Sequence, residues 1–504
     1  MRDGHQATRL CRATTSLLLA GLLAPRATAA EDTDPIPALE ASIAAAEASL
    51  QKGDREAAAA GYREALFLGR LLLARLDRLE RRPDSARRQL DAAAAEASSD
   101  PQAAFALASE NLWLGRPDTA DSLFARVLES HPGAETYVLI GRAYRDGREY
   151  GRARAALEAA LRLDPAARRA HYYLGMSVLA EGKSLDAVAA AEREFRQELK
   201  LVPGDPLTSD QLGLLLLDSA RPEEARPFLE ATVRAEPRSL GLSHLGRCQL
   251  ALDQPADAAV SLRRALQLAP EQGVSDRDLG NMHFQLGQAL RRLGRDAEAR
   301  GHLAEARRLA SEPLDQPEAP AAGPPEVQGG DSPPRRSELR LRASAAAARA
   351  CFNLGVLEAQ SRQPAVERYT RAAARFEQAA ELDPGFPQLQ ASLGIAYFNA
   401  RQFEKATGPL TRALAASPGD LGLQRMLATA WLDIGHYDEA ARLLKDDPGI
   451  ATRPEVAFAY GVALLRLGYA AAAVEPLQTA ARLAPGDAEA ARELGEARRL
   501  AAGR

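Results

Sequence analysis

Residues 135–165 read ETYVLIGRAYRDGREYGRARAALEAALRLDP, and this stretch contains the pattern that decides the fold. The apolar residues of its first half recur three and four positions apart, which indicates one face of an amphipathic helix: Tyr137, Ile140 and Tyr144. After a break at Asp146–Gly147 the same spacing returns, and Pro165 ends the second helix. The segment therefore predicts two helices that pack as a hairpin.

Small residues stand where the two helices are expected to cross. Gly141 on the first helix leaves room for the second helix to approach, and Ala153 on the second helix is predicted to face it. Ala160 is predicted to do the same against the next hairpin. A larger side chain at these positions would force the helices apart.

The hairpin recurs along the chain. Prolines follow one another at intervals of 33, 38, 34 and 33 residues and later of 34 and 67: Pro132, Pro165, Pro203, Pro237 and Pro270, then Pro384, Pro418 and Pro485. A glycine keeps the same period at Gly141, Gly213, Gly246, Gly394 and Gly461. Self-similarity with this period predicts a solenoid of stacked units.

The repeated unit resembles the tetratricopeptide repeat. Its positions carry small residues at 8, 20 and 27, an aromatic residue at 11, an apolar residue at 24 and proline at 32. Clear copies cover residues 101–133, 134–167, 168–205, 206–238, 239–273, 280–312, 348–386, 387–420, 421–453 and 454–487. The resemblance implies an all-α fold, a right-handed α-solenoid of helix-turn-helix repeats.

Some copies depart from the pattern. Two weaker copies, 39–72 and 67–100, overlap, so their register stays open. The copies at 168–205 and 348–386 are longer than the others, and Asp447-Pro448-Gly449 cuts the copy at 421–453 short. Such irregularities are expected to bend the stack locally.

Proline and glycine interrupt the helical pattern once, between residues 313 and 337, which predicts a linker. The linker divides the chain into an N-terminal array, 31–312, and a C-terminal array, 338–487, and the sequence leaves open whether it acts as a hinge. Residues 488–504 are predicted to form a polar helix that caps the last repeat.

The first 30 residues are predicted to be a secretory signal peptide. Arginines precede an apolar run, Leu17–Ala24, which is followed by Pro25 and by the small residues of a cleavage site, Ala27–Ala29. The run is too short to span a bilayer. We therefore expect a periplasmic or secreted protein, and the alternative is a misassigned start codon and a cytoplasmic protein.

Composition narrows the possible partners. Acidic residues number 68 against 64 basic ones, so the chain lacks the positive excess that nucleic acid requires. Aromatic residues make up only 5% of the chain, which favours closely packed helices over a sheet. The two cysteines outside the N-terminal segment, Cys248 and Cys351, lie in distant repeats and are predicted to be free, buried thiols.

A search for chemistry gives no catalytic constellation, no cofactor site and no metal site. Gly182-Lys183-Ser184 resembles part of a phosphate-binding loop, but its glycine spacing is wrong and no strand precedes it. Ser243 lies mid-helix, where an exposed, inert serine is expected. His244 and Cys248 offer two metal ligands where three or four are needed. The sequence therefore predicts that the protein is not an enzyme.

In the tetratricopeptide family, first-helix positions 2, 5, 9, 12 and 13 line a concave surface that binds partner peptides. Carried over to this sequence, they combine rigid aromatic residues with arginines, the residue types that binding hot spots favour. The candidate partner-binding residues are Phe105, Trp113, Arg142, Arg145, Tyr172, Arg247, Phe284, Arg291, Arg292, Phe352, Phe398, Arg425, Phe458 and Arg466. The lysines and asparagines with which cochaperone members hold a C-terminal carboxylate are missing, which disfavours a chaperone-tail clamp.

The predicted function is that of a scaffold that binds a protein or peptide partner in this groove. An alternative is a structural subunit of a cell-envelope assembly or export machine, and an enzyme is the third reading. The sequence leaves the identity of the partner and the oligomeric state open.

Overall fold

The computed structural model describes residues 36–97, 100–182, 184–311 and 333–503. Every regular element in these residues is a helix, which confirms the all-α prediction. The N-terminal helices are α2 (Ile36–Gln51), α3 (Arg55–Leu79), α4 (Pro83–Glu96), α5 (Pro101–Trp113), α6 (Pro117–Ser130), α7 (Ala134–Asp146), α8 (Tyr150–Leu163), α9 (Ala170–Glu181), α10 (Leu185–Leu201), α11 (Pro206–Asp218), α12 (Pro222–Ala235), α13 (Ser239–Ala251), α14 (Pro255–Leu268), η1 (Pro270–Gln272), α15 (Asp276–Arg292) and α16 (Asp296–Ser311). The C-terminal helices are α17 (Pro333–Ala359), α18 (Ala365–Leu382), α19 (Leu389–Asn399), α20 (Phe403–Ala416), α21 (Leu421–Asp433), α22 (Tyr437–Leu444), α23 (Gly449–Thr452), α24 (Pro454–Arg466), α25 (Ala470–Leu483) and α26 (Ala488–Ala502).

Each clear copy in the sequence corresponds to one antiparallel helix pair. The pairs run from α5–α6 to α15–α16 and from α17–α18 to α24–α25, and α26 packs on the last pair. Between neighbouring units, the second helix of one usually makes more contact with the first helix of the next than the two first helices make with each other. The chain is therefore an α-solenoid, as the repeat period predicts.

The spacing of small residues that recurs from repeat to repeat has a slightly different cause from the predicted one. A Cβ atom added at Gly141 would lie 2.6 Å from Leu157 Cγ, whereas Ala153 contributes only its carbonyl oxygen, at 3.3 Å. Gly213 and Gly246 face the equivalent leucines, Leu229 and Leu262, in the same way, each at 2.6 Å. The glycine thus makes room for the leucine at position 24 rather than for the alanine at position 20.

The repeats that differ in length from the others do so in their second helices. α10 has 17 residues and α18 has 18, and in both the residue that faces the glycine of the first helix is phenylalanine rather than leucine. These residues are Phe195, opposite Gly175, and Phe376, opposite Gly355. α22 has only 8 residues and is followed by the short α23, so the copy at 421–453 is shortened as predicted.

The overlap of the two weak N-terminal copies is explained by one long helix. α3 has 25 residues, and its first half pairs with α2 while its second half pairs with α4. Ala46 of α2 approaches Gly61 of α3, and Ala74 of α3 shares a core with Ala86 of α4. The same helix therefore serves as the second helix of one repeat and the first helix of another.

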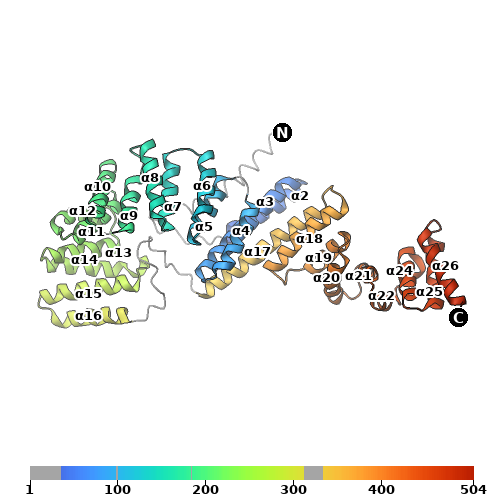
Figure 1. The fold of residues 1–504 in the computed structure, drawn as a ribbon. Helices are drawn as coiled ribbons and strands as arrows, with labels where there is room; N and C mark the ends of the chain where they lie inside the picture. The colour runs from blue at the N-terminus through green and yellow to red at the C-terminus, as the bar shows by residue number, and fades with distance from the viewer. Residues whose placement is uncertain (1–35, 98–99, 183, 312–332, 504) are drawn as a thin grey trace.

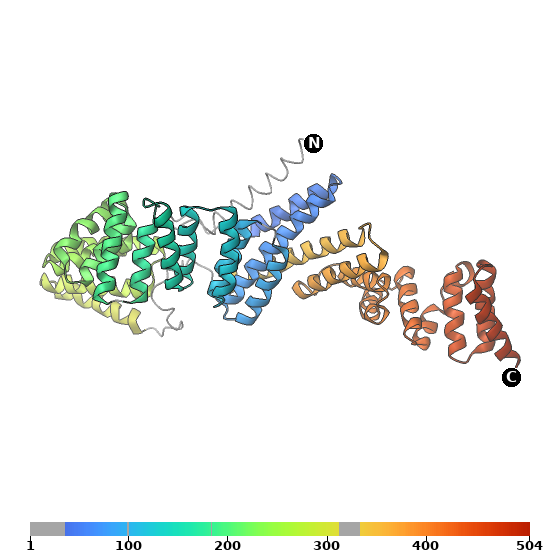
Figure 2. The same cartoon turned by 45° about the horizontal axis from the view of Figure 1, so that its top comes forward.

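Two arms leave this shared helix in opposite directions. The N-terminal arm, α4–α16, extends to one side, and the C-terminal arm, α17–α26, extends to the other, with α17 lying beside α2 and α3 (Figures 1 and 2). One core contains Tyr62 and Leu66 of α3 together with Cys351 and Leu354 of α17. The arms are thus joined by direct packing between α3 and α17, a contact that the sequence did not predict.

The predicted boundaries of the linker also need correction. Residues 333–337 belong to the start of α17, so the C-terminal array begins earlier than residue 338. The rest of the predicted linker, the predicted signal peptide at 1–30 and Lys183 lie outside the described residues. No helix in the described part of the chain is long and apolar enough to cross a membrane.

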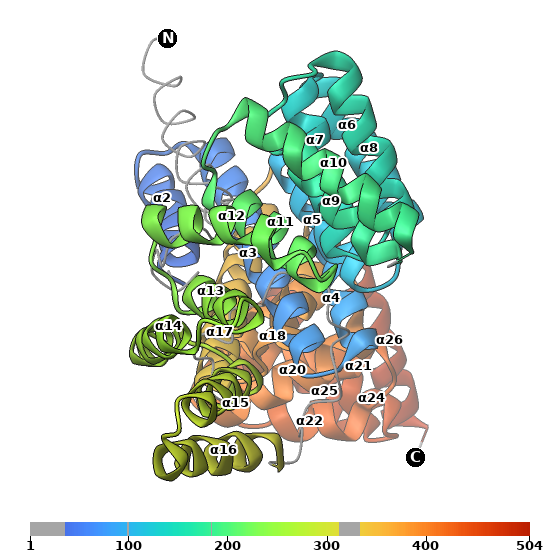
Figure 3. The same cartoon turned by 90° about the vertical axis from the view of Figure 1, so that its left-hand side faces the viewer.

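The arms end on polar surfaces. The N-terminal arm winds from α5–α10 on one side to α15 and α16 at its far end (Figure 3). At repeat positions where α13 and α14 carry Leu242 and Leu266, α15 and α16 carry His283 and Arg307. Polar residues replace the leucines that would pack on a further repeat, as the end of a solenoid requires.

Candidate interaction surface

The predicted groove residues lie on the first helices of successive repeats and are therefore spread along both arms. Most of them are already engaged within the fold. Cys248 and Cys351 are buried and free, as predicted, and contribute to the cores rather than to this surface.

Two of the predicted residues are core residues. The Phe105 side chain is 7% exposed, and its ring centroid lies 5.4 Å from that of Phe124. Arg145 is equally buried: its Nε donates to Asp146 Oδ1 at 2.9 Å, and its guanidinium lies 4.8 Å from the ring centroid of Tyr173. Neither side chain is accessible to a partner, which corrects the prediction for both.

Other predicted arginines pair with acidic residues of the preceding repeat or of their own helix. Arg247 of α13 binds Asp218 at the end of α11. Arg292 Nη1 of α15 donates to the carbonyl oxygen of Leu250 at 2.7 Å and lies 3.4 Å from Asp253 Oδ1. Within α7, Arg142 Nε lies 3.6 Å from Asp146 Oδ2. The contacts of Arg247 and Arg292 connect neighbouring repeats, whereas that of Arg142 lies within one helix, and all three arginines have an acidic partner.

The two predicted arginines of the last repeats bind carboxylates that are almost fully buried. Arg425 donates from Nε and Nη2 to Asp447 at 2.8 and 2.7 Å, and Arg466 Nη2 lies 2.9 Å from Glu493 Oε2 in α26. The hydrogen bonds from Arg425, with one from the Gly449 amide, hold the pKa of Asp447 below its usual value although burial raises it. Without Arg425 the buried Asp447 would lose its ion-pair partner, whereas Glu493 would keep Arg492, whose Nη2 lies 3.1 Å from Glu493 Oε1. Arg425 therefore has the larger structural role.

Five predicted aromatic residues are half-buried where helices meet: Trp113, Tyr172, Phe352, Phe398 and Phe458. Phe352 packs between Phe376 and Phe386, with centroid distances of 5.3 and 5.0 Å. The guanidinium of Arg78 covers the ring of Trp113 at 4.9 Å. These rings mainly fill the space between neighbouring helices, and only their edges face the solvent.

Tyr172 shows the same character. Its ring centroid lies 6.1 Å from that of Phe195, and the Arg169 guanidinium lies 5.6 Å from it. Burial raises the pKa of the Tyr172 hydroxyl to about 12. A hydroxyl in such surroundings belongs to the interior of the stack rather than to an open groove.

Phe284 and Arg291 are the exceptions. Both lie on α15, and the Phe284 side chain is 47% exposed. Arg291 is exposed, and its guanidinium has no ion-pair partner within the described ranges. Gln288 lies between them on the same helix face, because positions four and seven residues apart line up along a helix. These three residues form the α15 patch.

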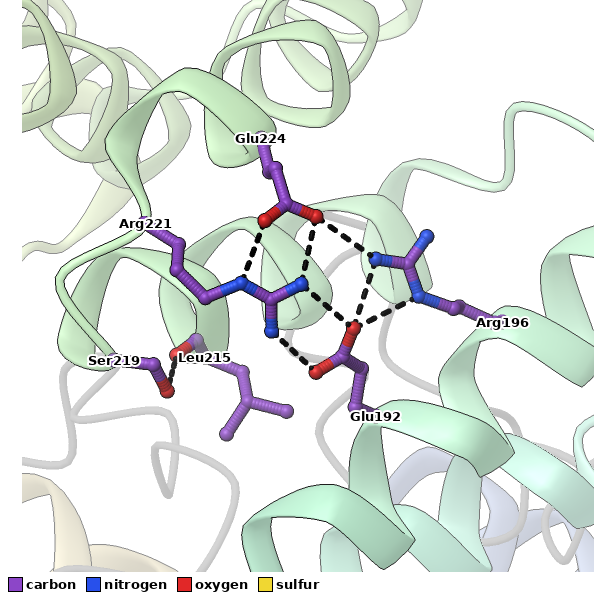
Figure 4. Close-up of polar contacts among 6 residues, drawn as sticks. All are labelled: Glu192, Arg196, Leu215, Ser219, Arg221 and Glu224. Carbon is purple, nitrogen blue, oxygen red and sulfur yellow. Dashed lines mark hydrogen bonds and ion pairs between the residues drawn. The ribbon is translucent and has the colours of Figure 1, made fainter.

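Ion pairs also connect the second helices of neighbouring repeats. Arg221, which precedes α12, donates from Nη1 to Glu192 Oε2 of α10 at 2.7 Å and from Nε to Glu224 Oε1 at 2.7 Å (Figure 4). Arg196 Nε donates to Glu192 Oε1 at 2.9 Å. Burial raises the pKa of Glu192, but the hydrogen bonds from both arginines outweigh it and hold that pKa below its usual value. Arginine in this chain therefore serves mainly to align repeats.

Sequence comparison agrees with the helix pairs. The pattern that defines the tetratricopeptide repeat matches residues 138–206, 211–273, 365–420 and 425–488, which together make up half of the chain. The chain belongs to the tetratricopeptide repeat family. Members of this family are scaffolds for protein–protein interaction, and this protein has their architecture.

Solved structures of tetratricopeptide proteins resemble parts of the chain. MamA from Desulfovibrio magneticus RS-1 is 23% identical over 35% of this chain and 94% of its own, with a TM-score of 0.31. YrrB, a tetratricopeptide protein described as having an unusual peptide-binding site, is 19% identical over 37% of this chain and 91% of its own, with a TM-score of 0.32. No curated protein matches the sequence.

Residues that resembled catalytic or metal-binding groups have structural contacts in this tetratricopeptide array. Ser243 is 6% exposed, which corrects the prediction of an exposed serine. His244 Nδ1 lies 2.9 Å from Asp210 Oδ1, while Cys248 Sγ donates to the Pro222 carbonyl oxygen at 3.3 Å, so the two do not converge on one point. The described residues contain no group of three or more side chains that could hold a metal ion.

A histidine pair in the last tetratricopeptide repeat of the N-terminal arm was not expected from the spacing of the histidines. His283 of α15 and His302 of α16 approach to 2.9 Å between their Nδ1 atoms, with ring centroids 5.1 Å apart. One ring must donate and the other accept, so both cannot be protonated in this geometry. Burial is the main cause that lowers the pKa of each, and for His283 the charge of His302 adds to it.

We expect the α15–α16 repeat to lose stability as the pH falls below about 6.5, the usual histidine value. A lowered pKa in the folded state means that the unfolded chain binds more protons in this range, so acid favours unfolding. Charged neighbours modulate the effect: Glu305 and Arg308 act on His283, and Glu298 and Arg263 act on His302. Hydrogen exchange in α15–α16 at pH 7 and pH 5, corrected for intrinsic rates, measures the loss.

The H302Q variant should show a smaller difference between the two pH values, because the pair can then no longer be doubly protonated. His436→Gln is the matched control, because the His436 side chain is 56% exposed and lies in the other arm. An equal pH response in H302Q and in the unmodified chain would contradict the assignment to this pair.

Proposed function

We propose that the protein is a non-catalytic scaffold that binds a peptide segment of a partner protein on the α15 patch. The observation that carries the proposal is that Phe284 and Arg291 are exposed where the other predicted groove residues are buried or paired. An exposed phenylalanine on the same helix face as an unpaired guanidinium is a combination that binding hot spots favour.

The composition of the patch indicates the chemistry of the partner. Phe284 offers an apolar surface, Gln288 offers an amide, and Arg291 offers an unpaired guanidinium two helical turns away. An acidic side chain placed about two turns or three extended residues from an apolar one would contact both ends. A guanidinium binds a carboxylate through two parallel hydrogen bonds, so we propose an acidic, apolar-containing peptide segment.

Selection of peptides against the full chain, followed by affinity measurement on a selected peptide, tests the proposal. The double variant Phe284→Ala with Arg291→Ala should weaken binding by at least about 30-fold, because hot-spot residues contribute about 2 kcal/mol or more. The melting temperature should not fall, since both side chains lie on the surface. Selected peptides should be enriched in acidic residues.

A control variant, Tyr469→Ala with Arg442→Ala, removes an aromatic residue that is 61% exposed and an arginine that forms an exposed pair on α22. It should bind the peptide like the unmodified chain. Unchanged binding by the Phe284 and Arg291 variant would overturn the proposed site, and loss of melting temperature together with binding would make these residues structural.

A further inference from the structure

The α2–α3 hairpin occupies the place of a preceding repeat for the C-terminal arm. α17 packs on α3 and, to a lesser extent, on α2, in the same way as α9 packs on α8 and α7. In the sequence, α17 comes after all the helices of the N-terminal arm. The first unit of the C-terminal stack is therefore supplied by the other end of the sequence, and Arg55 and Gln360 make contact although they are 305 positions apart.

The surfaces that meet here are closely matched. A Cβ atom added at Gly69 of α3 would lie 2.9 Å from Ala347 Cβ of α17. On α17, Ala343, Ala347 and Ala350 are fully buried, so the two helices approach along a row of small residues. Such close packing is specific, because a larger side chain on either helix would separate them.

The ion pairs across this junction share one orientation. In these ion pairs the cations come from α17 and α18, and the anions come from α2, α3, α4 and the turn after α3. Arg340 lies 2.8 Å from Asp77 Oδ1 and 3.0 Å from Glu80 Oε2, and Arg375 binds Glu96. The remaining pairs are Arg342 with Glu40 and Arg349 with Glu47.

This arrangement resembles an interface between two proteins more than a contact within one stack. A hydrophobic centre of matched shape is surrounded by ion pairs of one polarity, which is the pattern that selects a particular partner. Asp77 is almost fully buried at the junction, so its charge depends on Arg340 from the opposite side. A partner without an arginine at that point would leave a buried carboxylate unpaired.

We propose that the surface of α2–α4 is an autonomous binding site for the arm that begins with α17–α18. The partner is this C-terminal arm itself, and the covalent connection between residues 311 and 333 only raises its local concentration. A chain cut in that connection keeps its two pieces together. The same surface on one copy can bind the C-terminal arm of a second copy.

The test uses the full chain with a site for a specific protease inserted between residues 312 and 332 and cut after folding. Size-exclusion chromatography with light scattering at about 1 µM should give one species with the summed mass of both pieces, because close packing of small residues and ion pairs with buried carboxylates hold the pieces together. Elution of two separate pieces would overturn the proposal.

Charge variants identify the surface that holds the pieces together. Arg340→Glu with Arg375→Glu should make the cut pieces separate, and circular dichroism of the uncut variant should show the helical signal retained. Arg375→Glu alone should weaken co-elution, because it places two negative charges together at the Arg375–Glu96 pair. Adding Glu96→Arg restores opposite charges and should restore co-elution.

The control is Arg442→Glu, which reverses the charge of an exposed pair on α22, away from the junction. Its cut pieces should stay together. Separation in this control, or co-elution of the Arg340 and Arg375 variant after cutting, would show that the charges described here do not define the interface.

Discussion

Replacing Ala406 with arginine is expected to unfold much of the C-terminal arm. Ala406 is fully buried in α20, within a core that also contains Leu393 and Leu410. Arginine would place a charge without a partner between closely packed helices, at a cost of several kcal/mol. Because each repeat is stabilised by its neighbours, the loss should spread beyond α19–α20. Chemical denaturation followed by circular dichroism measures it as a lower denaturation midpoint.

Ala415→Arg provides a matched control on the same helix. Ala415 is exposed, so the same substitution there keeps the charge in water and should change the free energy of unfolding by less than about 0.5 kcal/mol. A neutral effect of Ala406→Arg would contradict the repeat register on which the whole fold assignment is based.

The repeat register could be read from the sequence because its signals are local. Gly141, Leu157 and Pro165 lie within one hairpin, so their spacing reports contacts between residues close together in the chain. The same local reading placed the shortened repeat before Gly449 and the lengthened α10 and α18. It also gave two overlapping N-terminal copies, whose common part lies within the continuous helix α3.

The arrangement of the arms could not be read in this way. The contact between Gly69 and Ala347 joins residues with no common period, and proline and glycine between residues 313 and 337 suggested a separation. The composition of residues 313–337 shows that this segment lacks a helical pattern. It does not show where the helices that follow it will pack. The packing of α17 on α3 depends on surface complementarity between distant segments, which periodicity does not encode.

The candidate site was predicted only in outline. Family positions indicate which face of a helix points inward, and they identified both Phe284 and Arg291. They do not show whether a neighbouring repeat supplies a carboxylate, as Asp218 does for Arg247 and Asp447 for Arg425. A search for acidic residues at inner-face positions one repeat away would have found Asp218, but not Asp447, which lies in an irregular turn.

Replacing Tyr62 with alanine is expected to destabilise the C-terminal arm, although Tyr62 lies near the N-terminus. Its side chain is 1% exposed and belongs to the core shared by α2, α3 and α17–α21. Truncating a large buried aromatic residue costs about 3–5 kcal/mol, because it removes apolar contacts and leaves a cavity. Hydrogen exchange should become faster in α17 and α18, while α9 and α10 stay protected.

Phe195→Ala is the matched comparison in the N-terminal arm. Phe195 is fully buried in a core that includes Leu212 and Leu216 of α11, so its loss should be of similar size but should speed exchange in α10–α12 and leave α17 and α18 unchanged. The contrast tests the junction, because both variants remove one large buried ring, each from a different stack, and Tyr62→Ala also removes a hydroxyl that hydrogen-bonds Asn353 of α17. Were α17 and α18 to stay protected in Tyr62→Ala, the arms would be independent units, and α2–α3 would be no part of the C-terminal stack.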